Sequence, residues 1–295
     1  MSTVSLATLN KAGEAAFIAA LGDIYEHAPW VAQSVLTERP FASIAALHAA
    51  MMAAVRAAPP DQRSALVRGH PDLAGKAARA GAMTNASKSE QASAGLDRLS
   101  EEEFARFHQL NDAYRQRFGM PFIICVRRHG KASILRSFER RLQNSLAVEE
   151  EAALNEVFRI AALRLDARIE GPDRLPVHGH LSTHVLDTHR GQPATGLMIE
   201  LAELVGNDEQ VVLKAGVTNR DGRPEEPLIS GRPLPIGRYE LRFHVGDYFA
   251  AWDVRLSDPP FLDIVPVRFA LAEPEGHYHV PLLLTPWSYT TYRGS

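Results

Sequence analysis

The sequence predicts two domains of different fold class: an all-α helical domain over residues 1–170, followed by an all-β antiparallel sandwich over residues 181–295. In the first part, apolar residues recur at three- and four-residue spacing, as on the buried face of a helix. In the second part, short β-branched or aromatic runs alternate with Gly, Pro, Asn and Asp, which is typical of antiparallel strands. Residues 171–180, which open on Gly-Pro-Asp-Arg-Leu-Pro, are expected to link two separate cores.

Periodicity and capping signals predict the helices. The apolar residues that mark the two clearest helices are Ile44, Leu47, Met51 and Val55 in one, and Phe104, Phe107, Leu110 and Tyr114 in the other. The second helix opens on a capping box of Ser100 and Glu103. Two further helices are expected over residues 131–145 and 148–168. A Gly-Met-Pro break precedes the short apolar run 122–126.

Strands are expected where β-branched and aromatic residues cluster. The predicted strands span residues 181–186, 196–204, 210–217, 237–244, 265–271 and 280–284. The end of the chain, residues 277–295, reads as a strand, a turn and a second strand. Because side chains two residues apart on a strand share a face, His277 and His279 are expected to point the same way.

Composition limits the class of partner. Hydrophobic residues make up 45% and charged residues 23%, and the formal net charge is −3. These values give no sign of a nucleic-acid or acidic-membrane partner. No apolar run approaches bilayer length, and the N-terminus lacks the pattern of a signal peptide. The one cysteine, Cys125, allows no disulfide within the chain and is expected to be buried, so a cytoplasmic, reducing location is expected.

The second domain carries a family resemblance. Its matching stretches are residues 181–194 (LSTHVLDTHRGQPA), residues 218–223 (TNRDGR) and the end, residues 277–295. Together they resemble 5-hydroxyisourate hydrolases, the transthyretin-like enzymes of urate breakdown, which work without a metal. The catalytic residues that the resemblance implies are His184, Arg223 and His279, and the residues that it implies close the site are Tyr292, Arg293, Gly294 and Ser295.

These residue types suit the hydrolysis of a cyclic acyl-urea bond. A histidine can activate water as a base near neutral pH, and Arg223 can hold the oxyanion with a forked donor. Alternatives stay open, because a histidine in a strand is more often structural and an arginine beside the Asp221-Gly222 turn is usually solvated. The histidines that could instead form a zinc cluster are His178, His180, His184, His277 and His279. The fold would also suit a transthyretin-like carrier of a small hydrophobic ligand.

Single residues of the first domain predict little by themselves. His70 precedes Pro71 and is expected at an exposed corner after a helix that ends near Arg68. Ser87 and Glu90 match a capping box, so a purely structural role for Glu90 is open. Arg164 would face solvent near a helix end.

The combination of motifs is more specific. The matching stretches are residues 69–73 (GHPDL), 87–91 (SKSEQ), 118–125 (FGMPFIIC) and 160–165 (IAALRL). Together they resemble 2-oxo-4-hydroxy-4-carboxy-5-ureidoimidazoline (OHCU) decarboxylases, which act after the hydrolase in the same pathway. The catalytic residues that this resemblance implies are His70 as the acid–base residue, Glu90 and Arg164; the substrate-binding residues are Pro71, Ser87, Gln91, Phe122, Ile123 and Ile124. No cofactor is expected, because the imine and carbonyl of the substrate can take the electron pair.

The two resemblances predict one bifunctional enzyme of urate breakdown, which hydrolyses 5-hydroxyisourate and decarboxylates the OHCU that is formed to (S)-allantoin. An alternative is that only one domain is active. Its partners would be these small-molecule substrates and copies of itself. A homo-oligomer is expected, a tetramer through the β domain with possible dimer contacts through the α domain.

Overall fold

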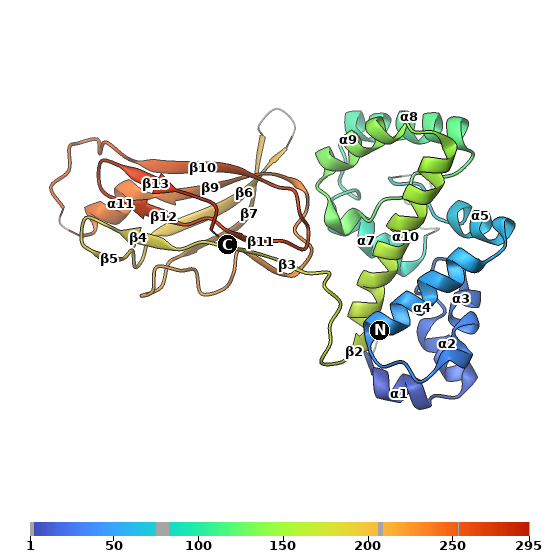
Figure 1. The fold of residues 1–295 in the computed structure, drawn as a ribbon. Coiled ribbons are helices and arrows are strands. Elements are labelled where there is room, and N and C mark those ends of the chain that lie inside the picture. The colour runs from blue at the N-terminus through green and yellow to red at the C-terminus, as the bar shows by residue number, and fades with distance from the viewer. Residues whose placement is uncertain (1–2, 75–82, 206–208, 253, 295) are drawn as a thin grey trace. The chain divides into compact units, whose positions relative to one another are not determined.

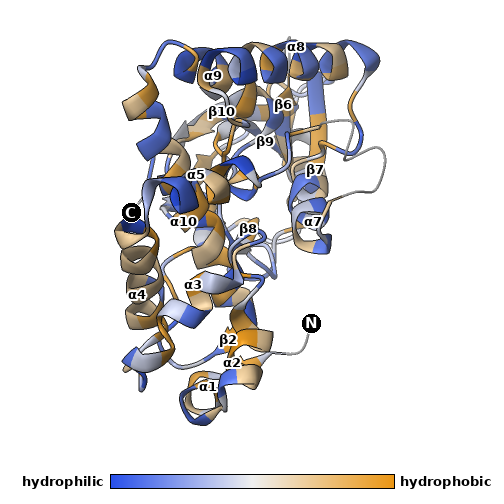
Figure 2. Cartoon of the chain, turned by 90° about the vertical axis from the view of Figure 1, so that its right-hand side faces the viewer, coloured by the Kyte–Doolittle hydropathy of each residue, from blue (hydrophilic) through white to orange (hydrophobic). Residues whose placement is uncertain are grey.

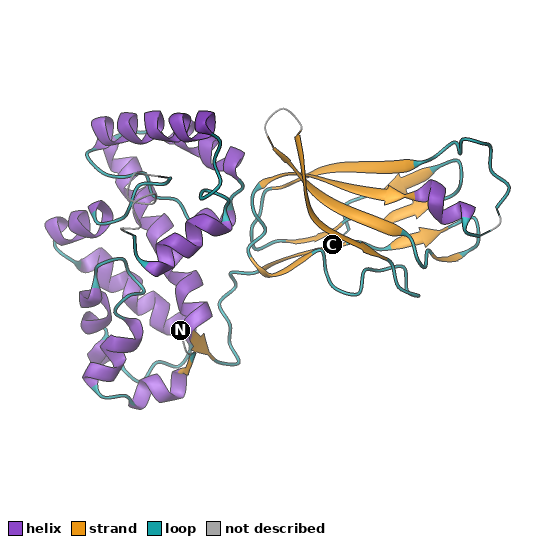
Figure 3. Cartoon of the chain, turned by 180° about the vertical axis from the view of Figure 1, so that it is seen from behind, coloured by secondary structure: helices purple, strands orange, loops and turns teal. Residues whose placement is uncertain are grey.

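The computed structural model describes residues 3–74, 83–205, 209–252 and 254–294 (Figure 1). The chain divides into two compact units, residues 1–127 with 134–177 and residues 128–133 with 178–295. Helices make up the first unit and strands dominate the second (Figure 3). The expected change from a helical to a β-rich region is therefore confirmed.

In the described part of the chain up to residue 168, the helices are α1 Leu6–Lys11, α2 Glu14–Leu21, α3 Pro29–Ser34, η1 Leu36–Glu38, α4 Ile44–Ala57, α5 Pro60–Arg68, α7 Asn85–Ser93, α8 Glu101–Phe118, η2 Val126–Arg128, α9 Lys131–Arg141 and α10 Leu146–Arg168. The short strands β1 Val4–Ser5 and β2 Ile169–Glu170 pair in parallel at the two ends of this region. Among the described residues, no helix is long and apolar enough to cross a membrane.

The predicted helix signals are confirmed in α4 and α8. The four apolar residues that mark α4 are all buried. The capping box of Ser100 and Glu103 opens α8, and Gly119 ends it at φ 67, a left-handed conformation that favours glycine. Figure 2 shows hydrophilic and hydrophobic residues interspersed along α8. The helix expected over 131–145 ends earlier, at Arg141, because Ser145 instead caps α10 by accepting from the Val148 N–H.

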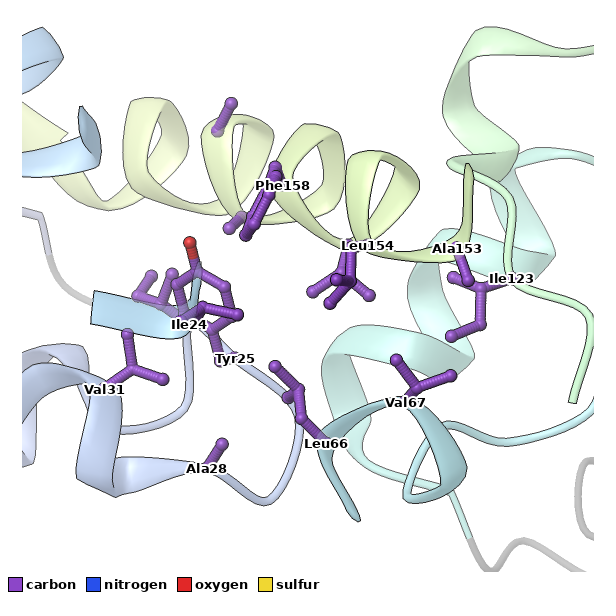
Figure 4. Packing of buried hydrophobic residues seen from close by; sticks show 14 of the residues in the cluster. Ile24, Tyr25, Ala28, Val31, Leu66, Val67, Ile123, Ala153, Leu154 and Phe158 are labelled. Atoms are coloured by element: carbon purple, nitrogen blue, oxygen red, sulfur yellow. The ribbon is translucent and has the colours of Figure 1, made fainter. Parts of the chain in front are cut away.

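The core of the first unit anchors the segments that carry the candidate site. Ile24 and Tyr25, which follow α2, pack in the same cluster as Leu66 and Val67 of α5 (Figure 4). Ile123, which follows α8, and Leu154, which lies on α10, belong to this cluster as well (Figure 4). Each of these segments is therefore fixed by apolar burial within a few residues of a polar group of the site.

The strands of the second unit are β3 Gly179–Ser182, β4 Val185–Asp187, β5 Gln192–Pro193, β6 Met198–Val205, β7 Glu209–Val217, β8 Ile229–Arg232, β9 Gly237–His244, β10 Ile264–Leu271, β11 His277–His279, β12 Leu282–Leu284 and β13 Tyr289–Thr291. They form sheets of order β10-β9-β6-β7, β11-β3-β8 and β13-β12-β4-β5. One apolar cluster contains residues of all three sheets, among them Leu181, Leu241 and Leu282.

Two features of these sheets differ from the expectation. The pairs β11·β3 and β12·β4 are parallel, so pairing in the unit is mixed and not purely antiparallel. Parallel pairing needs a long crossover, and the strands between β4 and β11 supply one. The run 181–187 is also two strands, interrupted at Thr183 and His184. The segment that pairs with this run has Pro281 between β11 and β12, and proline has no N–H to donate to the ladder.

A short helix, α11 Val245–Ala250, was not predicted. Its apolar and aromatic residues resemble those of the neighbouring strands, so local propensity does not reveal it. The Asp263 carbonyl accepts from the Val245 and Gly246 N–H groups at 2.9 Å. A contact distant in sequence therefore satisfies the first turn of the helix.

Candidate functional site

A cavity in the first unit brings together every described residue that was predicted for its site. The lining residues are His70, Pro71, Leu73, Ser87, Glu90, Gln91, Phe122, Ile123, Ile124, Cys125, Val126, Arg127, Ile160, Leu163 and Arg164. They come from the end of α5, from α7, from the run after α8 and from α10. The cavity contains a histidine, a carboxylate and two guanidinium groups, which is a combination suited to acid–base chemistry on an anion.

His70 is buried, with 7% of its surface exposed, so the expectation of an exposed imidazole was wrong. It does lie just beyond the C-terminus of α5, as predicted. Its Nδ1 lies 2.9 Å from the Leu66 carbonyl oxygen, which can only accept, so Nδ1 carries the proton. Burial lowers the pKa of His70, and the charge of Arg164 acts in the same direction. The ring therefore favours the neutral form in the free protein.

Arg164 binds Glu90 through a forked pair of hydrogen bonds. Its Nε lies 2.8 Å from one carboxylate oxygen of Glu90, and its Nη2 lies 2.9 Å from the other. The side chain of Arg164 is 8% exposed, so the solvent-facing interpretation was wrong. The capping-box interpretation of Glu90 was also wrong, because Thr84 caps α7 and Glu90 points to Arg164.

Sequence reasoning missed Glu26, a buried carboxylate that follows α2. It is 3% exposed and accepts from Thr84 Oγ1 at 2.7 Å, from Ser87 Oγ at 3.1 Å and from Arg164 Nη1 at 3.0 Å. Residues 21–28 (LGDIYEHA) also contain Asp23 and His27, so the sequence does not single out Glu26. Its partners Thr84, Ser87 and Arg164 are distant in sequence, so no short motif connects Glu26 to them.

Gln91 holds the loop that contains His70. Its Oε1 accepts from the Ala74 N–H at 2.9 Å, and its Nε2 donates to the Asp72 carbonyl at 3.3 Å. Ala74 has φ 51, a conformation that costs energy for any residue with a Cβ and persists where its surroundings impose it. On the opposite wall, Glu156 accepts from the Cys125 N–H at 2.9 Å and fixes that backbone. Cys125 is buried, as expected, and forms no disulfide.

A second cavity, of about 390 Å³, lies in the β-rich unit. Its lining residues are His180, Ser182, Thr183, Arg223, Pro224, Glu225, Glu226, Pro227, Leu228, His277 and His279. The histidines come from the adjacent strands β3 and β11, where His277 pairs with His180. His277 and His279 both border the cavity, in agreement with the expectation that they share a face.

His279 is held by a serine that sequence reasoning did not select. Ser182 Oγ lies 3.0 Å from His279 Nδ1, across the parallel pair β3·β11. The register places the two residues directly opposite one another. Burial lowers the pKa of His279, and the positive charge of Arg223 lowers it further. In the tautomer in which Nδ1 donates to Ser182 Oγ, Nε2 of the neutral ring is available as a base.

Arg223 and His184 lie in contact beside this cavity. Arg223 Nη2 lies 3.3 Å from His184 Nδ1, and Nε2 of His184 is buried without a partner in the described part of the chain. Burial, followed by the charge of Arg223, lowers the pKa of His184. Arg223 is exposed, as the turn suggested, but it also reaches His184. His184 does not border the cavity.

We expect the charge of Arg223 to affect the acid limb of the pH–rate profile, that is, the fall in rate at low pH, of any reaction that uses these histidines as bases. The base must be neutral, so the rate falls as pH drops through its lowered pKa. Arg223→Gln removes a positive charge, raises both histidine pKa values toward their ordinary range and moves the acid limb to higher pH. Arg223→Lys keeps the charge and should keep the limb low. The pH dependence of kcat/KM measures this, and an unchanged limb in Arg223→Gln would contradict the electrostatic role.

The end of the chain lies against His279 through its backbone. The Gly294 N–H donates to the His279 carbonyl at 2.8 Å. Arg293 is directed to Tyr278, with its guanidinium carbon 4.5 Å from the ring centre, and does not line the cavity of its own chain. Tyr292 is 57% exposed and is not a lining residue either. Ser295 lies outside the described residues.

The histidines do not form a metal centre in the described part of the chain. No group of three or more His, Cys, Asp or Glu side chains there has an arrangement that could hold a metal ion. His180 and His277 instead pack edge to face, with ring centres 4.8 Å apart.

These features define a class: a two-domain chain with a separate candidate active site in its helical and in its β-rich part. The sequence model of the OHCU decarboxylase family matches residues 10–166, more than half of the chain, and that of the HIUase/Transthyretin family matches residues 181–294. The chain therefore belongs to the OHCU decarboxylase family and carries a C-terminal domain of the HIUase/Transthyretin family.

Relatives and a solved structure resemble the two parts separately and together. A 5-hydroxyisourate hydrolase of Deinococcus radiodurans is 54% identical over 118 residues, which cover 40% of this chain and 98% of that protein. An OHCU decarboxylase of Haloferax volcanii is 42% identical over 168 residues, which cover 57% of this chain and 98% of that protein. A crystal structure of (S)-allantoin synthase is 36% identical, covers 99% of this chain and 100% of its own, and superposes with a TM-score of 0.52.

Proposed function

We propose that this chain is a bifunctional enzyme of urate breakdown, which hydrolyses 5-hydroxyisourate in its C-terminal domain and decarboxylates OHCU to (S)-allantoin in its N-terminal domain. The observation that carries the proposal is the first cavity. This cavity is bordered by all the residues that the decarboxylase resemblance implies for the site, although they are spread from position 70 to position 164. Membership of both families in one chain supports two consecutive reactions.

In the decarboxylase site, His70 is the proton donor. Glu90 and Gln91 bind the ring nitrogens and the ureido group, and Arg164 supplies positive charge near the substrate. Loss of CO2 leaves an electron pair that the imine and carbonyl of the substrate accept, and His70 then protonates the carbon on one face. The buried position of His70 fixes that face, because its Nδ1 is bonded to Leu66, and in the imidazolium form the proton on Nε2 is the one left for transfer.

In the hydrolase site, we assign the base to His279. It borders the cavity, whereas the Nδ1 of His184 already faces the Arg223 guanidinium. His279 takes a proton from water, and the hydroxide adds to the acyl carbon. Arg223 stabilises the oxyanion, and the ring C–N bond then breaks as the proton on His279 passes to the leaving nitrogen. His184 positions Arg223.

We also propose that the β-rich domain is a transthyretin-like sandwich and that the chain forms a homo-oligomer through it. The side chains of Tyr292 and Arg293 do not border the cavity of their own chain, so a site completed between subunits fits the implied role of the chain end. A reducing, cytoplasmic location fits the buried Cys125, which forms no disulfide.

The chirality of the product tests the proposal. Fresh 5-hydroxyisourate should be converted by the purified chain to a single enantiomer of allantoin, because one face of the intermediate is protonated. Circular dichroism of the product measures this, with a buffer-only reaction as control. A racemic product formed at the spontaneous rate would contradict the proposed function.

A further inference from the structure

A buried carboxylate outside the predicted site lies beside the groups that perform the decarboxylation. Glu26 receives hydrogen bonds from Thr84, Ser87 and Arg164, which belong to the start of α7 and to α10. Ser87 Oγ lies 3.1 Å from both of its oxygens. A carboxylate with this many donors is held in one orientation.

The charges around Glu26 do not cancel. Arg164 is already bound by Glu90 through a forked pair, so one guanidinium serves two carboxylates. With a neutral His70, the Glu26–Glu90–Arg164 cluster carries one excess negative charge in a largely buried place. An uncompensated buried charge is costly, and His70 is a nearby group that can neutralise it by taking up a proton.

The other ionisable groups near His70 act on its pKa in both directions. Among the described residues, the charged and titratable side chains that act on His70 or share its cavity are Glu26 and His27 after α2, Glu90 on α7, Cys125 and Arg127 after α8, and Arg164 on α10. His27 is exposed. The negative charge of Glu26 raises the pKa of His70, whereas Arg164 and His27 lower it. Glu26 itself stays ionised, because the bonds from Thr84 and Arg164 outweigh its burial and lower its pKa.

The strained backbone at His27, next to Glu26, helps to direct the Glu26 side chain inward. His27 has φ 52, in the left-handed region that a residue with a Cβ rarely adopts. Ile24 and Tyr25 on the other side of Glu26 are fixed in the core (Figure 4). The turn at His27 therefore leaves Glu26 directed inward while the chain continues to α3.

We propose that Glu26 is a positioning residue of the decarboxylase site, which orients Arg164 and Ser87 and supplies the counter-charge for protonated His70. The inference rests on the proposed function. During turnover the bond between the substrate carbon and its carboxylate breaks, CO2 leaves, and the electron pair stays on the substrate. The proton moves from the His70 imidazolium to the carbon, and His70 becomes neutral. Glu26 remains ionised throughout, and solvent returns a proton to His70.

The experiment compares Glu26→Gln, Glu26→Asp and the wild-type chain. The acid form of His70 is required, so kcat falls as pH rises through the pKa of His70 in the substrate complex. Loss of the Glu26 charge lowers that pKa and moves the basic limb to lower pH. We expect kcat of Glu26→Gln above neutral pH to fall on the order of tenfold or more, which is within the range for impaired general acid catalysis. Glu26→Asp keeps the charge and should restore the position of the limb, with KM changed more than kcat.

A second measurement keeps the proposal testable if Glu26→Gln is poorly active. NMR titration of labelled histidine in the folded variant, with His70 assigned by His70→Asn, should show a lower His70 pKa than in the wild type. A variant with the wild-type limb and the wild-type titration would overturn the role of Glu26. A uniform fall in kcat with an unmoved limb would also overturn the counter-charge. If the wild-type chain itself gave racemic allantoin, the proposed function would fail instead.

Discussion

Replacing His70 with asparagine is expected to lower the rate of OHCU decarboxylation on the order of a hundredfold or more, because loss of a general acid typically costs this much. The hydrolysis of 5-hydroxyisourate should continue at the wild-type rate, because its residues lie in the other unit of the chain. Allantoin should then form slowly and as a racemate, from spontaneous decay of the OHCU that accumulates.

The measurement follows absorbance of 5-hydroxyisourate and of OHCU in one reaction, together with circular dichroism of the product. His48→Asn is a matched control. Its Nε2 lies 3.1 Å from the Phe158 carbonyl in the same unit, so it also has a ring nitrogen bonded to a carbonyl, but it does not line the cavity. It should decarboxylate at close to the wild-type rate. A His70→Asn variant that still forms one enantiomer rapidly would remove His70 from the mechanism.

The sequence predicted the contents of the first cavity because each wall is a continuous short motif. Residues 69–73, 87–91 and 122–126 each come from one segment whose internal order is visible in the sequence. The burial of His70 could not be predicted in the same way. The effect of Pro71 on the preceding residue concerns backbone angles alone, and what covers the imidazole depends on segments distant in the chain.

Glu26 and Ser182 show where sequence reasoning ends. Glu26 meets Arg164 across 138 residues, and Ser182 meets His279 across 97. Neither pair has a spacing that a helix or strand period would reveal. The break in the strand at His184 could not be predicted for a related reason, because Pro281 lies in the segment that pairs with it and not in the run 181–187 itself. Alternation along 181–187 describes one strand and contains no information on its partner.

The end of the chain can be assigned a physical task from its contact with His279. The Gly294 N–H donates to the His279 carbonyl, and an added Cβ at Gly294 would lie 2.8 Å from Cδ2 of the His279 ring. The ring and the backbone of the tail therefore pack without space for a methyl group. Such packing limits how far the ring of a catalytic base can move.

Deleting Tyr292 to Ser295 is accordingly expected to lower hydrolysis on the order of a hundredfold, the cost of a misplacement of about 1 Å at a reacting group. The decarboxylase rate should not change. The melting temperature should fall little, because Tyr292 is 57% exposed and Arg293 contributes an exposed pair with Glu273 at 3.7 Å and its contact with the Tyr278 ring. The mass of the variant in solution must be measured alongside its rate, since the deletion could also act through an oligomer.

A point substitution separates these causes. Gly294→Ala leaves the tail in place but brings its Cβ against the His279 ring, so it should reproduce much of the loss of hydrolysis with an unchanged oligomer. Gly216→Ala on β7 is the matched control, because nothing lies within 4 Å of its added Cβ and it should hydrolyse normally. If Gly294→Ala and the deletion both turn over 5-hydroxyisourate at the wild-type rate, the tail does not constrain the base. His279 would then owe its orientation to Ser182 alone, and Ser182→Ala should be the variant that loses activity.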